Sequence, residues 1–259
     1  MIDIHSHILA GIDDGALTWN DSLIMAKAAV EEGIHTIIAT PHHQNGRYIN
    51  ERYNVERYIE EFQLALREEK IPLRVLAGQE NRVQPNLLKQ INIGNVGPLY
   101  ETNYILLELP SREIPHYTFA LLAQLQLAGY IPIIAHPERN HRIKEEPEIL
   151  LELVQRGALA QITAASLIGE FGGPIQKFTN QIVEANLAHF IASDAHNMLE
   201  RGFVLQKAYQ FIRNNYGHDV YYMFFENAEL LLEGQSVHRL KPMAVKQKRL
   251  FGWLTDRNG

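Results

Sequence analysis

Histidine and acidic residues follow short apolar runs at several places in the chain. The first run leads into Asp3-Ile4-His5-Ser6-His7, where one residue separates two imidazoles. Alternate residues of an extended strand project from the same face, about 6.5 to 7 Å apart, so His5 and His7 could bind one metal ion. An isolated His-x-His pair is equally compatible with an ordinary strand. Recurrence favours metal binding, because similar runs lead into His42-His43, His136 and Asp194-Ala195-His196.

The composition indicates one globular domain. The chain has 259 residues, of which 46% are hydrophobic, and no linker or low-complexity segment divides it. We therefore predict a single domain over residues 1–259, of the size of an α/β barrel. A membrane-spanning helix needs an apolar run of roughly 18 residues, and neither such a run nor a signal peptide is evident. We expect a cytoplasmic protein without an integral membrane segment.

Charge and the lack of cysteine exclude several kinds of chemistry. The net charge of −6 argues against nucleic acid as a partner, because binding to a phosphate backbone needs a basic face. The chain contains no cysteine, which excludes disulfides, thiolate metal ligands and a cysteine nucleophile. Hydrolytic chemistry would therefore need metal-activated water or an oxygen or nitrogen nucleophile.

A basic tail is predicted from about residue 236. It precedes Phe251-Gly252-Trp253-Leu254 and contains Arg239, Lys241, Lys246, Lys248 and Arg249. Such a tail could dock on a protein or on an anionic membrane surface, and the alternative is a solvated end without function.

Apolar periodicity predicts strands that alternate with helices. The predicted strands are residues 1–5, 34–40, 73–78, 104–109, 131–135, 158–163 and 188–193. The predicted helices are residues 19–32, 55–69, 116–127, 147–156, 174–185 and 203–214. This alternation is typical of a parallel sheet, and seven units favour an α/β fold with a distorted (β/α)7 TIM-like barrel.

The barrel model places the candidate ligands on one rim, because catalytic residues of such barrels collect at the carboxyl ends of the strands. Besides His5 and His7, the ligand types at strand ends are His42, Glu80, Glu108, His136, Asp194 and His196. The sixth strand, which ends in Gln161-Ile162-Thr163, supplies none. His43 would point to the other side of its strand and could be a ligand or a substrate contact. The glycine-rich loop at 168–174 could be a lid or a simple connection to the next helix.

Imidazole and carboxylate ligands without sulfur suit manganese, iron or zinc. The ligands outnumber the needs of one ion, and Glu80 could bridge two, so we expect two or three divalent ions. Arg139 and Arg201 follow His136 and His196, and their planar guanidinium groups match phosphate oxygens. Arg139 could instead form a structural ion pair with Glu138 or Glu145.

Five motifs resemble those of the polymerase and histidinol phosphatase (PHP) superfamily, and more narrowly those of bacterial tyrosine-protein phosphatases of the CpsB and YwqE type. The motifs are Asp3-Ile4-His5-Ser6-His7, Thr40-Pro41-His42-His43, Gly78-Gln79-Glu80, Ala135-His136-Pro137-Glu138-Arg139 and Ser193-Asp194-Ala195-His196. The resemblance covers nearly the whole chain. It implies the PHP fold, a trinuclear site that prefers manganese, and dephosphorylation of phosphotyrosine on proteins. It also implies that the partner is an autophosphorylating bacterial tyrosine kinase that controls capsule or exopolysaccharide synthesis.

The same resemblance implies three sets of metal ligands. They are His5, His7, Glu80 and Asp194 for the first ion, Glu80, Glu108 and His136 for the second, and His42, His196 and Asp14 for the third, with Asp14 preferred over Asp13. Many superfamily members have histidine at the position of Glu108. Arg139 and Arg201 match the positions that handle the phosphate.

The expected mechanism is in-line attack of a metal-bridged hydroxide on phosphorus, with the arginines stabilising transition-state charge. Metal-bound water or His43 could protonate the leaving oxygen. The closest alternative is a histidinol-phosphate phosphatase or another small-molecule phosphoesterase. A different class of alternative is a non-catalytic module that docks a kinase.

Overall fold

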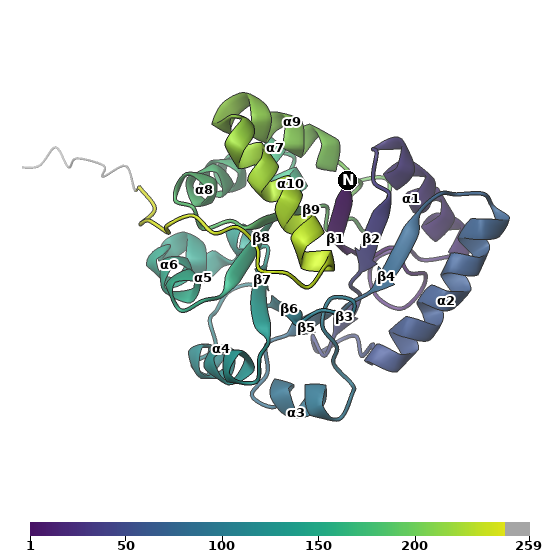
Figure 1. The fold of residues 1–259 in the computed structure, drawn as a ribbon, viewed down its shortest axis with the longest axis horizontal. Helices are drawn as coiled ribbons and strands as arrows, with labels where there is room; N and C mark the ends of the chain where they lie inside the picture. The colour runs from purple at the N-terminus through teal and green to yellow at the C-terminus, as the bar shows by residue number, and fades with distance from the viewer. Residues whose placement is uncertain (247–259) are drawn as a thin grey trace, which may run out of the picture.

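The structure is a computed structural model that describes residues 1–246 as an α/β fold in which parallel strands alternate with helices (Figure 1). The strands are β1 (Ile2–Ser6), β2 (Thr36–Ala39), β3 (His42–His43), β4 (Arg74–Ala77), β5 (Glu80–Arg82), β6 (Tyr104–Glu108), β7 (Ile131–Ala135), β8 (Leu159–Thr163) and β9 (Phe190–Ala192). Each of the seven predicted strands is present. Lys248, Arg249 and residues 251–254 of the predicted basic tail lie outside the described residues.

The strands form two parallel sheets. One has the order β1-β2-β4 and the other the order β3-β5-β6-β7-β8-β9. The division arises because β2 and β4 each stop, and after a break of two residues a short strand begins, β3 after β2 and β5 after β4. Pro41 lies in the first break and has no N–H for the ladder. Gly78 lies in the second, where a Cβ atom would come within 2.7 Å of Ile38 Cγ2.

The predicted distorted barrel is not confirmed, because no closed sheet is found among residues 1–246, although the two sheets meet where β9 ends beside β1. Asp194 N donates to His5 O at 2.9 Å, and His7 N donates to Ala195 O at 2.8 Å. These hydrogen bonds join the main chains of the candidate ligands His5, His7 and Asp194 and of Ala195, which follows Asp194. This junction therefore fixes the spacing between His5, His7 and Asp194.

Helices lie around the outside of the strands, as Figure 1 shows. They are α1 (Trp19–Glu31), α2 (Arg52–Glu68), α3 (Leu87–Asn92), α4 (Thr118–Leu127), α5 (His141–Glu145), α6 (Glu148–Gln155), α7 (Ala164–Ile168), α8 (Gly173–Glu184), α9 (Leu205–Tyr216) and α10 (His218–Leu232), with a 3-10 turn, η1, at Pro137–Arg139. Among residues 1–246 we find no helix with the length and apolar character that crossing a membrane requires.

One hydrophobic cluster packs strand side chains against α10, which crosses the strands in Figure 1. Its members include Ile4, Ile38, Leu106, Ile133, Leu159, Phe190, Ala228 and Leu231. The described part of the predicted basic tail also packs on the fold: Val237 and Val245 are buried, and Met243 N donates to Ala185 O at 2.9 Å. Residues 236–246 are therefore anchored on the fold at these points, while most of their side chains are exposed.

Candidate metal centre

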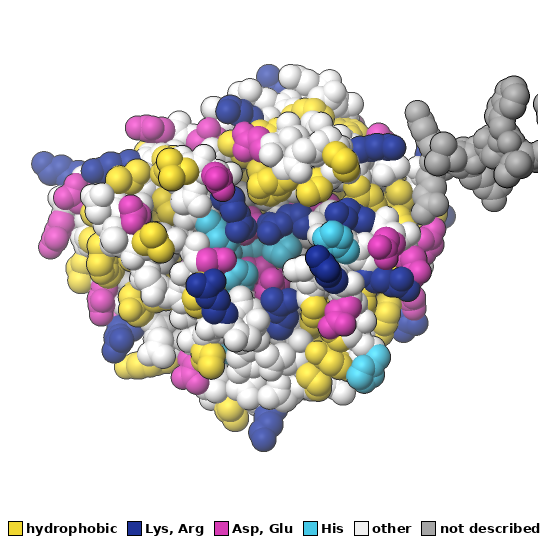
Figure 2. All heavy atoms as spheres, turned by 180° about the vertical axis from the view of Figure 1, so that it is seen from behind, with side chains coloured by type: hydrophobic (Ala, Val, Ile, Leu, Met, Phe, Trp, Pro, Cys, Tyr) yellow, Lys and Arg dark blue, Asp and Glu magenta, His cyan; other side chains and the backbone are white. Residues whose placement is uncertain are grey.

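Nine candidate ligands converge at the carboxyl ends of the strands. They are five imidazoles and four carboxylates: His5, His7, His42, His136, His196, Asp14, Glu80, Glu108 and Asp194. Figure 2, which views the molecule from behind Figure 1, shows histidine and acidic side chains in a hollow surrounded by Lys and Arg. The structure thus brings all nine predicted metal ligands to one place.

His5, His7, Glu80 and Asp194 form the most compact group. The two Nε2 atoms of His5 and His7 lie 3.2 Å apart. Glu80 Oε2 lies 3.4 Å from His5 Nε2 and 3.3 Å from His7 Nε2, and Asp194 Oδ1 lies 3.5 Å and 3.4 Å from the same two atoms. Four ligand atoms about 2.1 Å from a shared ion at tetrahedral angles would be about 3.4 Å apart. The spacing fits one divalent cation.

Glu80 also faces a second group through both of its oxygens. Its Oε1 lies 2.7 Å from His136 Nε2, and its Oε2 lies 2.9 Å from His42 Nδ1. Glu108 Oε2 lies 3.6 Å from the same His42 nitrogen. A carboxylate in this position can bridge two ions, as the sequence predicted for Glu80.

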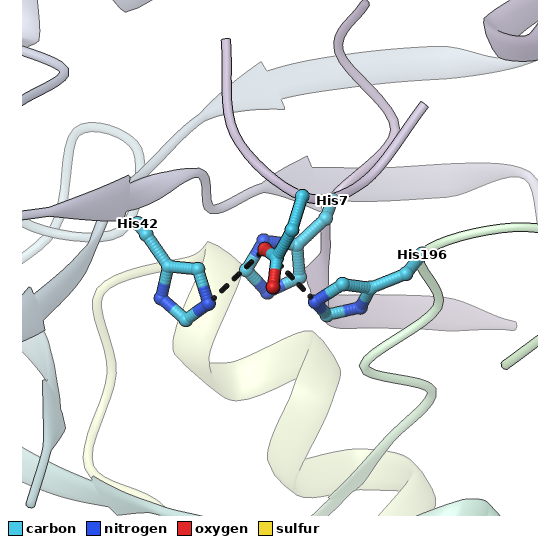
Figure 3. A group of neighbouring side chains, drawn as sticks. His7, His42 and His196 are labelled. Carbon is cyan, nitrogen blue, oxygen red and sulfur yellow. Dashed lines mark ion pairs between the residues drawn. The ribbon is translucent and has the colours of Figure 1, made fainter. Parts of the chain in front are cut away.

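A third group surrounds Asp14. Its Oδ1 lies 3.4 Å from His42 Nε2 and 3.5 Å from His196 Nε2. Figure 3 shows His7, His42 and His196 approaching one another from three separate segments, with dashed lines for the two ion pairs. Because His42 faces Asp14 with one nitrogen and Glu80 with the other, it lies between the second and third groups.

Several polar atoms of this cluster are buried and form no hydrogen bond of acceptable geometry among residues 1–246, although Glu80 Oε2 and Glu108 Oε2 lie at ion-pair distance from His42 and Arg82. They are Glu80 Oε2, Glu108 Oε2, Asp194 Oδ1, His42 Nδ1 and His196 Nε2. Leaving a buried acceptor unpaired is costly, and a bound cation removes that cost. The donor set therefore fits divalent metal ions with nitrogen and oxygen ligands.

Asp13 has a different role from its neighbour Asp14. Its Oδ2 lies 2.7 Å from His7 Nδ1, and its Oδ1 accepts from Gly15 N at 2.9 Å. A carboxylate on the outer nitrogen of a ligand histidine fixes the ring and its tautomer. Gly15 is required here because a Cβ atom would lie 2.0 Å from His7 O.

Gln161 is a supporting residue that the sequence analysis missed. The sixth predicted strand, β8, supplies no ligand, but Gln161 Oε1 lies 2.9 Å from His5 Nδ1. Both residues are fully buried. The available signal was a polar side chain inside the apolar run Ala158–Thr163, although the run does not reveal its partner.

Two ligand residues adopt a left-handed backbone conformation directly after their strands. His136 has φ 33° and Asp194 has φ 52°. Residues other than glycine rarely adopt these φ values, and such backbone conformations occur often at functional sites. Asp194 is held there by its neighbour, since Ser193 donates from both N and Oγ to the buried carboxylate of Asp3.

Arg139 and Arg201 both face one oxygen of Asp194. Arg201 Nη2 lies 2.7 Å from Asp194 Oδ2, and Arg139 Nη1 donates to the same atom. The alternative pairing of Arg139 with Glu138 is not formed, because Glu138 Oε1 accepts from Thr163 N at 2.9 Å. The two cations therefore lie at the edge of the cluster, where they can reach a phosphoryl group.

Arg82 is a third arginine at the site and was not predicted. Its Nη2 lies 3.1 Å from Glu108 Oε2, and the two residues are paired across β5 and β6. The signal available in the sequence was its position two residues beyond Glu80, on the same face of a strand.

The electrostatics of the cluster favour bound cations. Burial, then the charge of Glu80, raises the pKa of Glu108 to about 7. Burial, then the charge of Arg139, lowers the pKa of His136 to about 4, so its imidazole is neutral as a metal ligand requires. Burial would raise the pKa of Asp194, but Arg139 and His5 hold it well below its usual value.

His43 lies outside the cluster. Its side chain is buried, and its Nδ1 accepts from Asn50 N at 3.1 Å. Burial lowers the pKa of His43 to about 4. The alternation of the strand correctly predicted that His43 and His42 point to different sides.

Comparison with known proteins identifies the class to which this fold and site belong. Residues 1–233 match the family described as capsular polysaccharide synthesis, CpsB/CapC. The chain is 48% identical to the tyrosine-protein phosphatase YwqE of Bacillus subtilis (strain 168), over 98% of this chain and 100% of that protein. It is 39% identical to the putative tyrosine-protein phosphatase CapC of Staphylococcus aureus, over 98% of this chain and 100% of the relative.

A solved structure supports the same assignment. It comes from work on YwqE from Bacillus subtilis and CpsB from Streptococcus pneumoniae, described as unique metal-dependent tyrosine phosphatases. It superposes with a TM-score of 0.93 at 48% identity and covers 95% of this chain and 100% of the other. The protein belongs to the CpsB/CapC family.

Proposed function

We propose that this protein is a metal-dependent tyrosine-protein phosphatase that serves capsule or exopolysaccharide synthesis. The observation that carries the proposal is the convergence of buried, unpartnered ligand atoms beside Arg139 and Arg201. Membership of the CpsB/CapC family supports phosphotyrosine as the substrate, because its relatives YwqE and CpsB bear the name tyrosine-protein phosphatase.

The proposed centre holds two or three divalent ions, with manganese as the preferred metal, and the same donors suit iron or zinc. We assign His5, His7, Glu80 and Asp194 to the first ion, Glu80, Glu108 and His136 to the second, and Asp14, His42 and His196 to the third. His42 also approaches Glu80 and Glu108, so it could contribute to the second ion. Such ions, when bound, neutralise phosphoryl charge and lower the pKa of water.

Arg139 and Arg201 orient the phosphoryl group and balance the charge that develops on its oxygens. A guanidinium fork donates two parallel hydrogen bonds to phosphate oxygens, and both arginines are fixed by Asp194 before substrate binds. The leaving group is a phenol with a pKa near 10, so it needs a general acid less than an alkyl alcohol does. We give His43 no proton transfer, because its ring is fully buried and forms no ion pair with a candidate ligand among residues 1–246: Nδ1 accepts from Asn50 N, and Nε2 has no hydrogen-bond partner.

The family resemblance also supports more specific proposals. We infer that the two sheets are one interrupted seven-stranded barrel, and the hydrogen bonds between β1 and the end of β9 support this view. We further propose a cytoplasmic protein whose substrate is an autophosphorylating bacterial tyrosine kinase.

A comparison of substrates tests the proposed function. Purified protein loaded with manganese is assayed with a phosphotyrosine peptide, a phosphoserine peptide and histidinol phosphate. We expect the phosphotyrosine peptide to give the highest kcat/KM, and His136→Ala to remove most of the activity. A strong preference for histidinol phosphate would establish the small-molecule alternative. Lack of any phosphatase activity would leave the docking module as the better account.

A further inference from the structure

A cavity of about 630 Å³ opens beside the candidate metal centre. Its lining includes Gln44, Arg82, Gln84, Pro110, His116 and Tyr117. It is larger than the pocket of about 160 Å³ that Glu108, His136 and Arg139 line on the other side of the loop after β6. None of the roles assigned above to the metal ligands or to Arg139 and Arg201 uses this larger cavity.

The position of the cavity follows from the strands that build the metal centre. Gln44, Arg82 and Pro110 each lie two residues beyond a candidate ligand, namely His42, Glu80 and Glu108. The strands that bear these ligands, β3, β5 and β6, are hydrogen-bonded neighbours. Arg82 shares the face of β5 with Glu80, while Gln44 and Pro110 follow the ends of β3 and β6 within two residues, so the cavity wall begins just beyond the strand ends that bear the candidate ligands.

Hydrogen bonds hold this wall in a defined shape. Gln84 Nε2 donates to Gln44 O at 2.7 Å, and Tyr117 Oη donates to Val83 O at 3.2 Å. Arg82 joins the cavity to the metal centre, because its Nη2 lies 3.1 Å from Glu108 Oε2. The cavity is therefore a prearranged extension of the site and not a gap between loose loops.

We propose that this cavity binds the polypeptide on one side of the phosphotyrosine, so that it selects protein substrates over small phosphate esters. The inference rests on the proposed tyrosine phosphatase function. A phosphoryl group at the metals directs the rest of the substrate away from the ligands, and this wall begins two residues beyond three of them. Asn45 Oδ1 already accepts from Arg47 N and Tyr48 N, and Gln84 Nε2 already donates to Gln44 O, which leaves the Asn45 amide nitrogen to donate to a peptide main chain and the Gln84 amide oxygen to accept from it.

The charges of the lining also suit a peptide main chain. Arg82 is balanced by Glu108, and the cavity also contains Glu113. It is thus not a purely basic pocket for a second phosphate. A neutral, hydrogen-bonding wall is better matched to an extended segment with alternating N–H and C=O groups.

The test fills the cavity without touching a metal ligand. His116 lines the cavity and is exposed, so His116→Trp would occupy it, and Gln84→Met would remove the amide with little change in length. The control is Glu101→Trp. Glu101 lies before β6 in the sequence and lines a different cavity, of about 270 Å³, beside α2. Each protein is loaded with manganese and assayed with a ten-residue phosphotyrosine peptide and with p-nitrophenyl phosphate.

We expect His116→Trp to raise KM for the peptide by about fivefold or more, with kcat within about twofold, while kcat/KM for p-nitrophenyl phosphate stays within about twofold. Gln84→Met should shift the peptide KM in the same direction, and Glu101→Trp should change neither substrate. Equal losses on both substrates, or no loss on either, would overturn the inference. Failure of the proposed function is distinguishable, because the unaltered protein would then not hydrolyse the phosphotyrosine peptide.

Discussion

Asp13 Oδ2 lies 2.7 Å from His7 Nδ1, while His7 Nε2 faces Glu80 and Asp194. This geometry favours Asp13 as the partner of a candidate ligand histidine over a role as a ligand itself. Burial would lower the pKa of His7, but the charge of Asp13 raises it well above its usual value. The pair makes the ring nitrogen that faces the cluster more basic and holds its orientation.

Substitution of Asp13 should weaken metal binding. Asp13→Asn retains an oxygen that can accept from His7 but removes the negative charge, so we expect manganese affinity to fall by about tenfold or more. The activity at saturating manganese should stay near that of the unaltered protein. A titration of phosphatase activity with manganese measures both quantities. Asp219→Asn, at an exposed position in α10, is the control. A loss of kcat with unchanged manganese affinity would contradict a supporting role.

Gln161 supports His5 in a similar way from a strand that carries no ligand. Gln161→Leu would leave His5 Nδ1 without its acceptor in a buried place, so manganese affinity should fall by about tenfold. Gln161→Glu restores an acceptor and should recover most of that loss. Calorimetric titration with manganese compares the three proteins. Equal affinity in Gln161→Leu and the unaltered protein would rule out this role.

Arg139 should affect catalysis more than metal binding. Arg139→Ala removes a donor for phosphoryl charge, and we expect kcat to fall by about 100-fold. Manganese affinity should stay the same or rise, because Asp194 loses one competing cation. The guanidinium of Arg139 lies over Phe171, 5.6 Å from the ring centre. Arg156→Ala is a matched control, since the guanidinium of Arg156 lies 5.1 Å from the centre of Phe119 but at the surface. A large fall in manganese affinity with unchanged kcat at saturation would contradict the assignment.

His189 should make folding stability depend on pH. Burial, then the charge of Arg239, lowers the pKa of His189 to about 3 in the folded protein, against about 6.5 in an unfolded chain. Between these values the unfolded state binds more protons, so the free energy of unfolding should fall as pH falls from 6.5, by at most about 1.4 kcal/mol per pH unit. Denaturant unfolding at several pH values measures the slope.

His189→Asn tests the assignment of that slope. Ala160 N donates to His189 Nδ1 at 3.2 Å, and an asparagine oxygen can accept in its place without titrating. The difference in unfolding free energy between the two proteins should therefore change with pH below 6.5. Parallel curves would show that other groups cause the pH dependence.

The sequence predicted which candidate ligands converge better than it predicted the groups around them. His5, His7, Glu80 and Asp194 were expected to lie together because parallel strands end at one rim, and the structure brings them together. Gln161 was missed because its partner lies 156 residues away, and nothing local in β8 points to His5. The seven strands were predicted from apolar periodicity, which is likewise a local pattern. The interruptions that divide them into two sheets depend on local packing at Gly78 and on Pro41.

The central claim is that the clustered carboxylates and imidazoles form a metal centre that hydrolyses phosphotyrosine. The most direct measurement is elemental analysis together with activity on a phosphotyrosine peptide, before and after chelation and again after reloading with manganese. We predict no activity in the stripped protein, and recovery as two to three ions bind per chain. Full activity in protein shown to be free of metal, or no activity after reloading, would contradict the account.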